Sequence, residues 1–502
     1  MGAACPAFSA NTRMIKDYQS QKELRDHYDV CIIGGGPAGI TLALRLAGNG
    51  RRVLLVEGGG HEYSSASQNL YKISSSGLEM YAHETRLRYL GGTSNHWAGR
   101  CRPFEKSDFT VGPPVPLPGW PIAFSEIERT LSAAMDIVDL APHSGFKAIN
   151  ASLDGTDFEA DRFLLSPPTR FAQKYAKELN ETEGLDVFIH CNCVDLEFDS
   201  KTGRIATIVV SDYQLQRERV RAKRFILATG AIENARHLLN SESLAAGGIV
   251  GKDGFVGRCF MEHLNVEMGN FILKDGQGTD ARQEYFTTDT FVMAHNAGKG
   301  NVTATLVSEV KSYGRMAAVK SFFENLVCEV GAERKVEFIA KFDCPGDGVI
   351  GTLIEQFPNP DSRISLLDER DALGMRKVEI HWELTPADRE TVKAIGLEVA
   401  KSFADTGLGF VKLEEYVYDV DLPLKLNPHA HHMGTTRMAS SPEFGVVDEN
   451  CKVFGVENLY VAGSSVFSTG GACNPTMPLL QLALRLADYL NHQMGPGVGR
   501  YS

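Results

Sequence analysis

The feature that most constrains this chain is a glycine-rich turn between two apolar segments near its N-terminus. Residues 30–33 form a short apolar run, residues 34–39 read GGGPAG, and apolar side chains then recur at helical spacing. A second apolar run, residues 53–56, ends at Glu57, 18 residues after the last glycine of the turn. This order of strand, turn, helix, strand and acid predicts a β-α-β unit that binds a dinucleotide.

Each position of this unit has a physical role. Gly34 permits the tight turn, and Gly36 lets backbone amides approach a pyrophosphate closely. Gly39 lets the helix pack against the strand, and the helix N-terminus faces the phosphates with its partial positive charge. Glu57 is placed to bind the hydroxyls of the adenosine ribose. The unit predicts where the nucleotide half of a cofactor binds.

The rest of the chain favours FAD over a nicotinamide cofactor, which would normally be bound by further regular β-α units. Instead, a second glycine loop with His and Trp lies at residues 91–99. A later strand ends at Ala228, and another strand, residues 458–463, precedes an amphipathic helix at 479–490. Pieces spread over the whole chain suit a long cofactor that is bound along its length.

Composition excludes several other classes of protein. The 51 basic and 63 acidic residues give a net charge of −12, which disfavours nucleic-acid binding. Ten cysteines are too few for a disulfide scaffold, and the pair Cys191 and Cys193 reads as part of a strand and not as a metal site. Residues 1–28 lack the apolar core of a signal peptide, and no apolar run is long enough to insert into a membrane. We expect a cytoplasmic protein.

Rare residues concentrate again near the C-terminus. Residues 429–438 read HAHHMGTTRM, and residues 470–478, GGACNPTMP, open the last predicted helix. Three histidines in four positions suggest a metal site, but no carboxylate or cysteine lies at a fitting spacing, so we predict no metal. Pro475 suits the first turn of a helix, whose N-terminus would stabilise the negative charge of a reduced flavin.

These motifs together resemble those of the glucose–methanol–choline (GMC) oxidoreductases, over residues 28–492. Within that family the loop GGTSNHW and the C-terminal stretch are most similar to pyranose oxidases and bacterial sugar or glycoside dehydrogenases. The resemblance implies that an alcohol, here a secondary hydroxyl of a sugar or glycoside, is oxidised to the carbonyl by hydride transfer to flavin N5. It further implies two catalytic residues, His431 as the base and Asn474, 43 residues later.

The chemistry of the side chains agrees with these roles. Imidazole, with a pKa near 6.5, is suited to take the hydroxyl proton, and the Asn474 amide would orient the hydroxyl and support the developing alkoxide. Asn474 would also suit a helix cap, a role compatible with catalysis. His429 and His432 are interpreted as structural or supporting. His263 either approaches the substrate or is a hydrogen-bonded hinge residue.

The implied FAD contacts are spread over five segments of the chain. His96 in the second glycine loop is either bonded covalently to the flavin, as the matching residue of pyranose oxidases is, or packs near the ring with Trp97. The contacts are expected at Gly34, Gly36, Gly39, Glu57, Gly91, Gly92, Thr93, Asn95, His96, Val194, Ala228, Gly463, Ser464, Asn474 and Thr476.

The predicted fold is α/β plus α+β. A discontinuous Rossmann-like FAD-binding domain (residues 24–110, 186–263 and 431–495) interleaves with a substrate domain (111–185 and 264–430) built on a largely antiparallel sheet. Alternating apolar residues predict strands of that second domain at 336–342 and 378–382. Residues 62–85 and 276–303, rich in small polar residues, are expected to form surface loops or a lid.

Other functions stay open at this point. The substrate could be a non-sugar alcohol, or the protein could be a flavin-bearing lyase that cleaves hydroxynitriles. It could also be the catalytic subunit of a membrane-bound electron-transfer complex, exported with a partner. The electron acceptor could be oxygen, a quinone or a protein, and an oligomer is possible.

Overall fold

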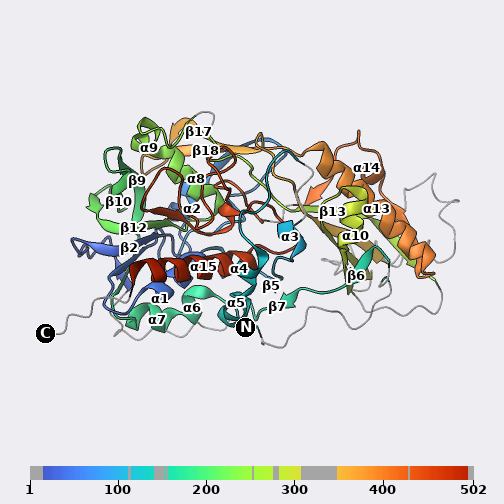
Figure 1. Ribbon diagram of the computed structural model, residues 1–502, viewed down its shortest axis with the longest axis horizontal. Coiled ribbons are helices and arrows are strands. Elements are labelled where there is room, and N and C mark those ends of the chain that lie inside the picture. The colour runs from blue at the N-terminus through green and yellow to red at the C-terminus, as the bar shows by residue number, and fades with distance from the viewer. Residues whose placement is uncertain are drawn as a thin grey trace.

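A computed structural model describes residues 15–110, 115–140, 153, 156–251, 254–274, 282–306, 348–427 and 430–495. Figure 1 shows two parts along the long axis of the molecule, one around β2, β12 and α15 and the other around β13, α10 and α13. Each part has a large buried apolar core. Within the described residues, no helix is both long and apolar enough to cross a membrane.

The first part is built on a six-stranded sheet in which every neighbouring pair is parallel. Most residues of its four central strands are buried, because a parallel sheet is covered on both faces. In order across the sheet, the strands are β1 (Ile15–Asp17), β8 (Leu185–Ile189), β3 (Val53–Val56), β2 (Tyr28–Ile33), β12 (Ala222–Leu227) and β21 (Leu459–Val461).

Helices and a meander complete this part. The helix α1 (Pro37–Leu46) follows β2 directly and packs against α15 (Thr476–Met494), which lies more than 400 residues later. The helix α15 also contacts α4 (Phe124–Glu128) and α5 (Leu131–Ile137). Other elements are α6 (Phe171–Lys174), α7 (Ala176–Glu181), α8 (Ala231–Asn240), α9 (Glu242–Ala246), β9 (Asn192–Asp199), β10 (Arg204–Ser211) and β11 (Arg217–Val220).

The second part is a seven-stranded sheet in which all the pairs are antiparallel. The 20-residue helix α13 (Pro386–Asp405) packs against it and begins with a capping box between Thr385 and Asp388. The strands are β19 (Gly409–Leu413), β13 (Leu264–Leu273), β16 (Gly348–Ile354), β15 (Gly300–Leu306), β14 (Arg282–Thr287), β6 (Phe158–Ala160) and β20 (Leu426–Asn427); shorter helices are α10 (Asp289–His295) and α14 (Glu415–Tyr418).

A three-stranded sheet lies beside α8, and its buried side chains belong to the second core. Strand β18 (Arg376–Trp382) pairs antiparallel with β17 (Arg363–Arg370) and parallel with β4 (Ile73–Gly77), and α8 contacts β17. The predicted strand at 378–382 is therefore present, in this small sheet. The predicted strand at 336–342 lies outside the described residues. A two-stranded pair, β5 (Arg100–Cys101) with β7 (Leu164–Leu165), completes the sheets.

The expectation of loops or a lid was wrong for most of residues 276–303. Of these, residues 282–287 form β14, residues 289–295 form α10 and residue 300 begins β15. Strand β4 likewise lies within the expected loop at 62–85. The small polar residues misled the prediction because pairing within a sheet, and not side-chain polarity, decides whether such a segment is ordered.

The predicted fold class is confirmed, a Rossmann-like parallel sheet accompanied by an antiparallel sheet. The domain boundaries stay a prediction. Residues 120–138, assigned to the substrate domain, place Trp120, Ile127 and Ala134 in the first core, where α4 and α5 contact α15.

Candidate active site

A cavity at the carboxyl edge of the parallel sheet collects the motifs that are scattered along the sequence. It runs from the glycine turn after β2 to the histidines after residue 430. Of the predicted site residues, ten line it: Gly34, Gly36, Glu57, Gly92, Thr93, Ala228, His431, Gly463, Ser464 and Thr476. The other six, which are Gly39, Gly91, Asn95, His96, Val194 and Asn474, lie outside its lining.

The glycine turn forms a cradle at the N-terminus of α1. Gly36 is the N-cap, Pro37 is the first helical residue, and a Cβ added at Gly36 would meet no atom within 4 Å. This open space between backbone and cavity fits a pyrophosphate held by the helix N-terminus. A Cβ at Gly39 would instead overlap the Gly34 carbonyl oxygen, so Gly39 serves the packing of the helix against the turn.

The carboxylate of Glu57 stabilises the same turn. It is 7% exposed, and its two oxygens accept hydrogen bonds from the Gly35 and Gly59 amides at 2.8 and 2.7 Å. Each carboxylate oxygen has a second lone pair, so Glu57 can still accept hydrogen bonds from ribose hydroxyls.

The second glycine loop lies beside this turn, and the Gly91 amide donates to the Gly35 carbonyl. Within the loop, Asn95 donates its side-chain amide to the Leu90 carbonyl at 2.9 Å, which makes it a support of the loop. Trp97 lines the cavity and donates its indole N–H to the Thr169 carbonyl. His96 is exposed; the desolvation that it does undergo lowers its pKa, while a hydrogen bond with the Thr85 backbone acts in the opposite direction.

A half-buried arginine lines the cavity and was not predicted. The guanidinium of Arg88 donates to Ser67, Tyr213 and Asn192 and lies beside Gly58, next to Glu57. No local pattern in the sequence marks it, because its neighbours come from distant segments. Val194, which was predicted, packs instead in a small cluster with Leu70, Leu373 and Met375.

At the other end of the cavity, two backbone segments are held together by an antiparallel bridge. Met261 and Met433 exchange both backbone hydrogen bonds, at 3.1 and 3.0 Å. This bridge brings His263 and His431 together although 168 residues separate them. Two non-glycine residues near the bridge, Cys259 and Ala430, have φ values of 58° and 64°, a strained conformation that recurs at functional sites.

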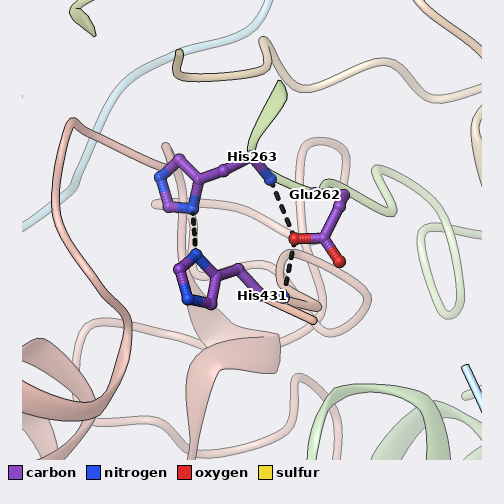
Figure 2. A group of neighbouring side chains, drawn as sticks. All are labelled: Glu262, His263 and His431. Carbon is purple, nitrogen blue, oxygen red and sulfur yellow. Dashed lines mark hydrogen bonds between the residues drawn. The ribbon is translucent and has the colours of Figure 1, made fainter. Parts of the chain in front are cut away.

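Figure 2 shows how the side chains at this bridge meet. The Nδ1 atoms of His263 and His431 lie 2.9 Å apart, with the two rings nearly perpendicular at 88°. The Oε1 atom of Glu262 accepts the backbone N–H groups of His263 and His431 at 3.0 and 2.6 Å. One carboxyl group therefore fixes the backbone of both histidines. In the sequence, only its position next to His263 pointed to Glu262 as a residue of the site.

Burial governs the pKa values of these groups. It raises the pKa of Glu262 to about 8, although the backbone hydrogen bonds that the carboxyl accepts act in the opposite direction. It lowers the pKa of His263 to about 4. His432, whose Nε2 lies 3.7 Å from Glu262, lines the cavity and has its pKa lowered to about 3 by burial. His263 and His432 are therefore neutral near pH 7.

The loop that carries Asn474 is attached to the same cluster. The Gly471 carbonyl lies 2.7 Å from His263 Nε2, and the Gly471 amide donates to Glu355 Oε1 at 2.9 Å. The Oδ1 atom of Asn474 is buried and has no hydrogen-bond partner in the part of the chain that the structure describes. A buried amide oxygen without a partner is rare in proteins and fits a group that accepts from a bound molecule.

Glu262, His263 and His431 also bring donor atoms within 4.8 Å of one another, a grouping that can hold a metal ion. The 2.9 Å between the two Nδ1 atoms is the length of a hydrogen bond. Two metal-bound nitrogens at about 2.0–2.1 Å from the ion would lie farther apart in a tetrahedral site. The arrangement fits proton sharing between two imidazoles.

Two family models match this chain. Residues 29–243 match the FAD dependent oxidoreductase model, and residues 358–483 match the GMC oxidoreductase C-terminal model. The first covers the glycine turn and the second covers His431 and Asn474.

Curated relatives align over most of the chain. The 2-methyl-1,2-propanediol dehydrogenase of Mycolicibacterium austroafricanum is 23% identical over 93% of this chain and 96% of its own length. The C-glycoside 3-oxidase of Microbacterium trichothecenolyticum is 23% identical over 80% of this chain and 75% of its own. Among solved structures, pyridoxine 4-oxidase from Mesorbium loti has a TM-score of 0.59 at 18% identity, over 93% of this chain and 99% of that one.

Proposed function

The chain belongs to the GMC oxidoreductases, FAD-dependent enzymes that act on CH–OH groups, and from this premise we propose that it oxidises a secondary hydroxyl of a sugar or glycoside to the carbonyl. The observation that carries the proposal is a set of two unlike groups, the imidazole of His431 in the cavity lining and the buried amide oxygen of Asn474, the residue just before Pro475 of that lining. One can take a proton, and the other can accept a hydrogen bond.

The residues of the cavity fit FAD. The open cradle at Gly36 and the N-terminus of α1 would hold the pyrophosphate, and Glu57 would bind the ribose hydroxyls. The N-terminus of α15, with Pro475 and Thr476 in the cavity lining, would stabilise negative charge at the flavin end. When bound, FAD supplies the acceptor for the hydride that leaves the substrate carbon.

Side chains of the protein would accept the proton of the substrate hydroxyl. His431 would accept the hydroxyl proton at its Nε2 atom, and Asn474 would orient the hydroxyl toward it. The neighbouring neutral groups, His263 and His432, exclude water from this end of the cavity because both side chains are buried. A base surrounded by buried groups is shielded from competing solvent.

The names of the relatives support the substrate class and leave a second candidate. One relative is a C-glycoside 3-oxidase, which favours a secondary hydroxyl of a glycoside. Another, aligned over nearly its full length, is a dehydrogenase of 2-methyl-1,2-propanediol, which favours a small non-sugar alcohol. The proposal takes the sugar or glycoside as substrate and oxygen, a quinone or a protein as electron acceptor.

An anaerobic titration tests the proposal. The purified holoenzyme is mixed with D-glucose, D-fructose, methyl β-D-glucopyranoside, 2-methyl-1,2-propanediol or benzyl alcohol while its flavin absorbance is recorded. Bleaching by a carbohydrate supports the proposal, and bleaching by the diol alone supports the second candidate. A flavin that no alcohol bleaches would overturn both and favour a lyase. Readmitting air then shows whether oxygen is the electron acceptor.

The proposal also places the enzyme in the cytoplasm. The seven cysteines within the described residues are free and buried, which is typical of proteins in a reducing compartment. Fractionation of the producing cells with an antibody to the chain tests this placement, and recovery in an oxidising compartment would contradict it.

A further inference from the structure

The contact between the two imidazoles requires that one of the facing nitrogens carries a proton and the other does not. Both atoms of the 2.9 Å contact, dashed in Figure 2, are Nδ1, one on His263 and one on His431, and the two rings meet edge to face. An imidazole N–H donates and a bare imidazole nitrogen accepts. The direction of this hydrogen bond therefore fixes a tautomer, which is the arrangement of ring protons, on each histidine.

A backbone carbonyl decides the direction. His263 Nε2 lies 2.7 Å from the Gly471 carbonyl oxygen, which has only lone pairs, so His263 must carry its proton on Nε2. His263 is 1% exposed, and burial keeps its pKa near 4, so the ring holds a single proton at neutral pH. Its Nδ1 atom is consequently an acceptor.

The proton in the contact must then belong to His431. Its Nδ1–H donates to His263, and in a neutral ring the lone pair is left on Nε2. We propose that His263 is a positioning residue that selects this tautomer of His431, because its Nε2–H donates to the Gly471 carbonyl and its Nδ1 accepts from His431 Nδ1–H, and so makes His431 Nε2 the basic atom. The inference deepens the proposed function and rests on it, since it explains how the same base is prepared.

The surrounding structure holds this arrangement rigid. The Met261–Met433 bridge and the Glu262 carboxyl fix the backbone on both sides of the contact. Glu355 holds the backbone on the N-terminal side of this carbonyl, because it accepts the Gly471 amide N–H at 2.9 Å. The carbonyl that sets the tautomer is thus fixed in direction, three residues before Asn474.

The proton balance of the step follows. The substrate O–H bond breaks, a new N–H bond forms at His431 Nε2, and the electron pair of the C–H bond leaves with the hydride for the bound FAD. The resulting His431 cation still donates Nδ1–H to His263, in a hydrogen bond that is now charge-assisted and stronger. The proton stays on His431, because a second proton on His263 would charge a buried ring.

Two matched variants separate the two hydrogen bonds of His263. In His263→Asn the amide oxygen replaces Nδ1 as acceptor and the bond to Gly471 is lost. In His263→Gln the amide N–H replaces Nε2 as donor and the acceptor for His431 is lost. We expect His263→Gln to lower the limiting rate of anaerobic flavin reduction about 10- to 100-fold with little change in substrate affinity. The limiting rate of His263→Asn should be at least about tenfold higher than that of His263→Gln. Equal losses in the two variants, or a greater loss in His263→Asn, would overturn the proposal.

A second measurement needs no substrate and reads the ring protons of the wild-type protein directly. In holoenzyme with ¹⁵N-labelled histidine, long-range ¹H–¹⁵N spectra distinguish protonated from bare ring nitrogens. We expect His263 protonated at Nε2 and His431 at Nδ1, assigned with His431→Gln. The opposite tautomer of His431 would refute the inference. Failure of the proposed function shows separately, as a wild-type flavin that no alcohol bleaches.

Discussion

Gly36 and Gly39 lie three residues apart in one turn, yet an added methyl group would enter open cavity at the first and overlap the Gly34 carbonyl oxygen at the second. The two glycines of the fingerprint therefore serve different purposes. One faces open space in the cavity, where we expect the cofactor, and the other leaves room for the packing of α1.

The variants Gly36→Ala and Gly39→Ala separate these purposes. We expect Gly36→Ala, whose backbone φ of −83° suits alanine, to leave the melting temperature of the apoprotein nearly unchanged while its FAD dissociation constant rises at least about tenfold, or ~1.4 kcal/mol. Gly39→Ala should destabilise the apoprotein by about 1–3 kcal/mol through overpacking. Apoprotein melting and FAD titration measure the two effects. The interpretation would be wrong if Gly36→Ala lost apoprotein stability and Gly39→Ala did not.

Replacing His431 should remove the base and leave the cofactor in place. We expect His431→Ala to lower the limiting rate of anaerobic flavin reduction by about 10²–10⁴-fold, the usual contribution of a general base. The ratio of flavin to protein absorbance checks that FAD is retained. His27→Ala, at an exposed position, is the control and should match the wild type. A variant that keeps the full rate would exclude His431 as the base.

Asn474 should be expendable for the fold and required for the reaction. Its Oδ1 atom is buried without a partner among the described residues, so its removal should not lower the melting temperature of the apoprotein. The rate of flavin reduction should nevertheless fall about 10²-fold in Asn474→Ala, by analogy with the loss of one group that supports an alkoxide. A marked loss of apoprotein stability with an unchanged rate would show that the residue serves only as a helix cap.

The buried carboxyl of Glu262 should make stability depend on pH. Its pKa is raised from 4.5 to about 8 by burial, so the folded protein binds one proton more than the unfolded chain between these values. This contribution to stability is fully present below pH 4.5 and is lost as the pH rises through 8.

Glu262→Gln lacks this proton, so its melting temperature should rise relative to wild type as the pH increases from 5 to 8.5. Paired melting curves of the holoenzymes at three pH values in this interval measure the difference. The contribution of Glu355, whose pKa is also raised, to about 7, is present in both proteins and cancels. A difference independent of pH would contradict the assignment.

His96 should not be bonded to the flavin. It lies outside the cavity lining, whereas its neighbours Thr93 and Trp97 line the cavity. We therefore expect acid precipitation of the holoenzyme to leave a yellow supernatant containing released FAD. A yellow pellet with a colourless supernatant would show that His96 moves to the flavin and forms the bond.

The glycine turn shows what the sequence can predict. Its residues are contiguous, and strand, turn, helix and acid follow one another within about thirty residues, so their spacing alone indicates the β-α-β unit and its ligand. The motif around His431 could likewise be recognised in the sequence, through its resemblance to a known family. By contrast, small polar residues at 276–303 suggested loops, where pairing with distant strands produces β14 and β15.

The sequence by itself therefore determined the fold class and the cofactor, and it named two residues, His431 and Asn474, whose catalytic roles stay a prediction. Only the tertiary structure decided which groups surround them. His263 and His431 are 168 residues apart, and only the Met261–Met433 bridge brings their rings into contact. Gly471 and Glu355 join the same group from two further segments. The direction of a hydrogen bond depends on which groups face one another in space. The positions of these residues along the chain do not indicate that they are in contact.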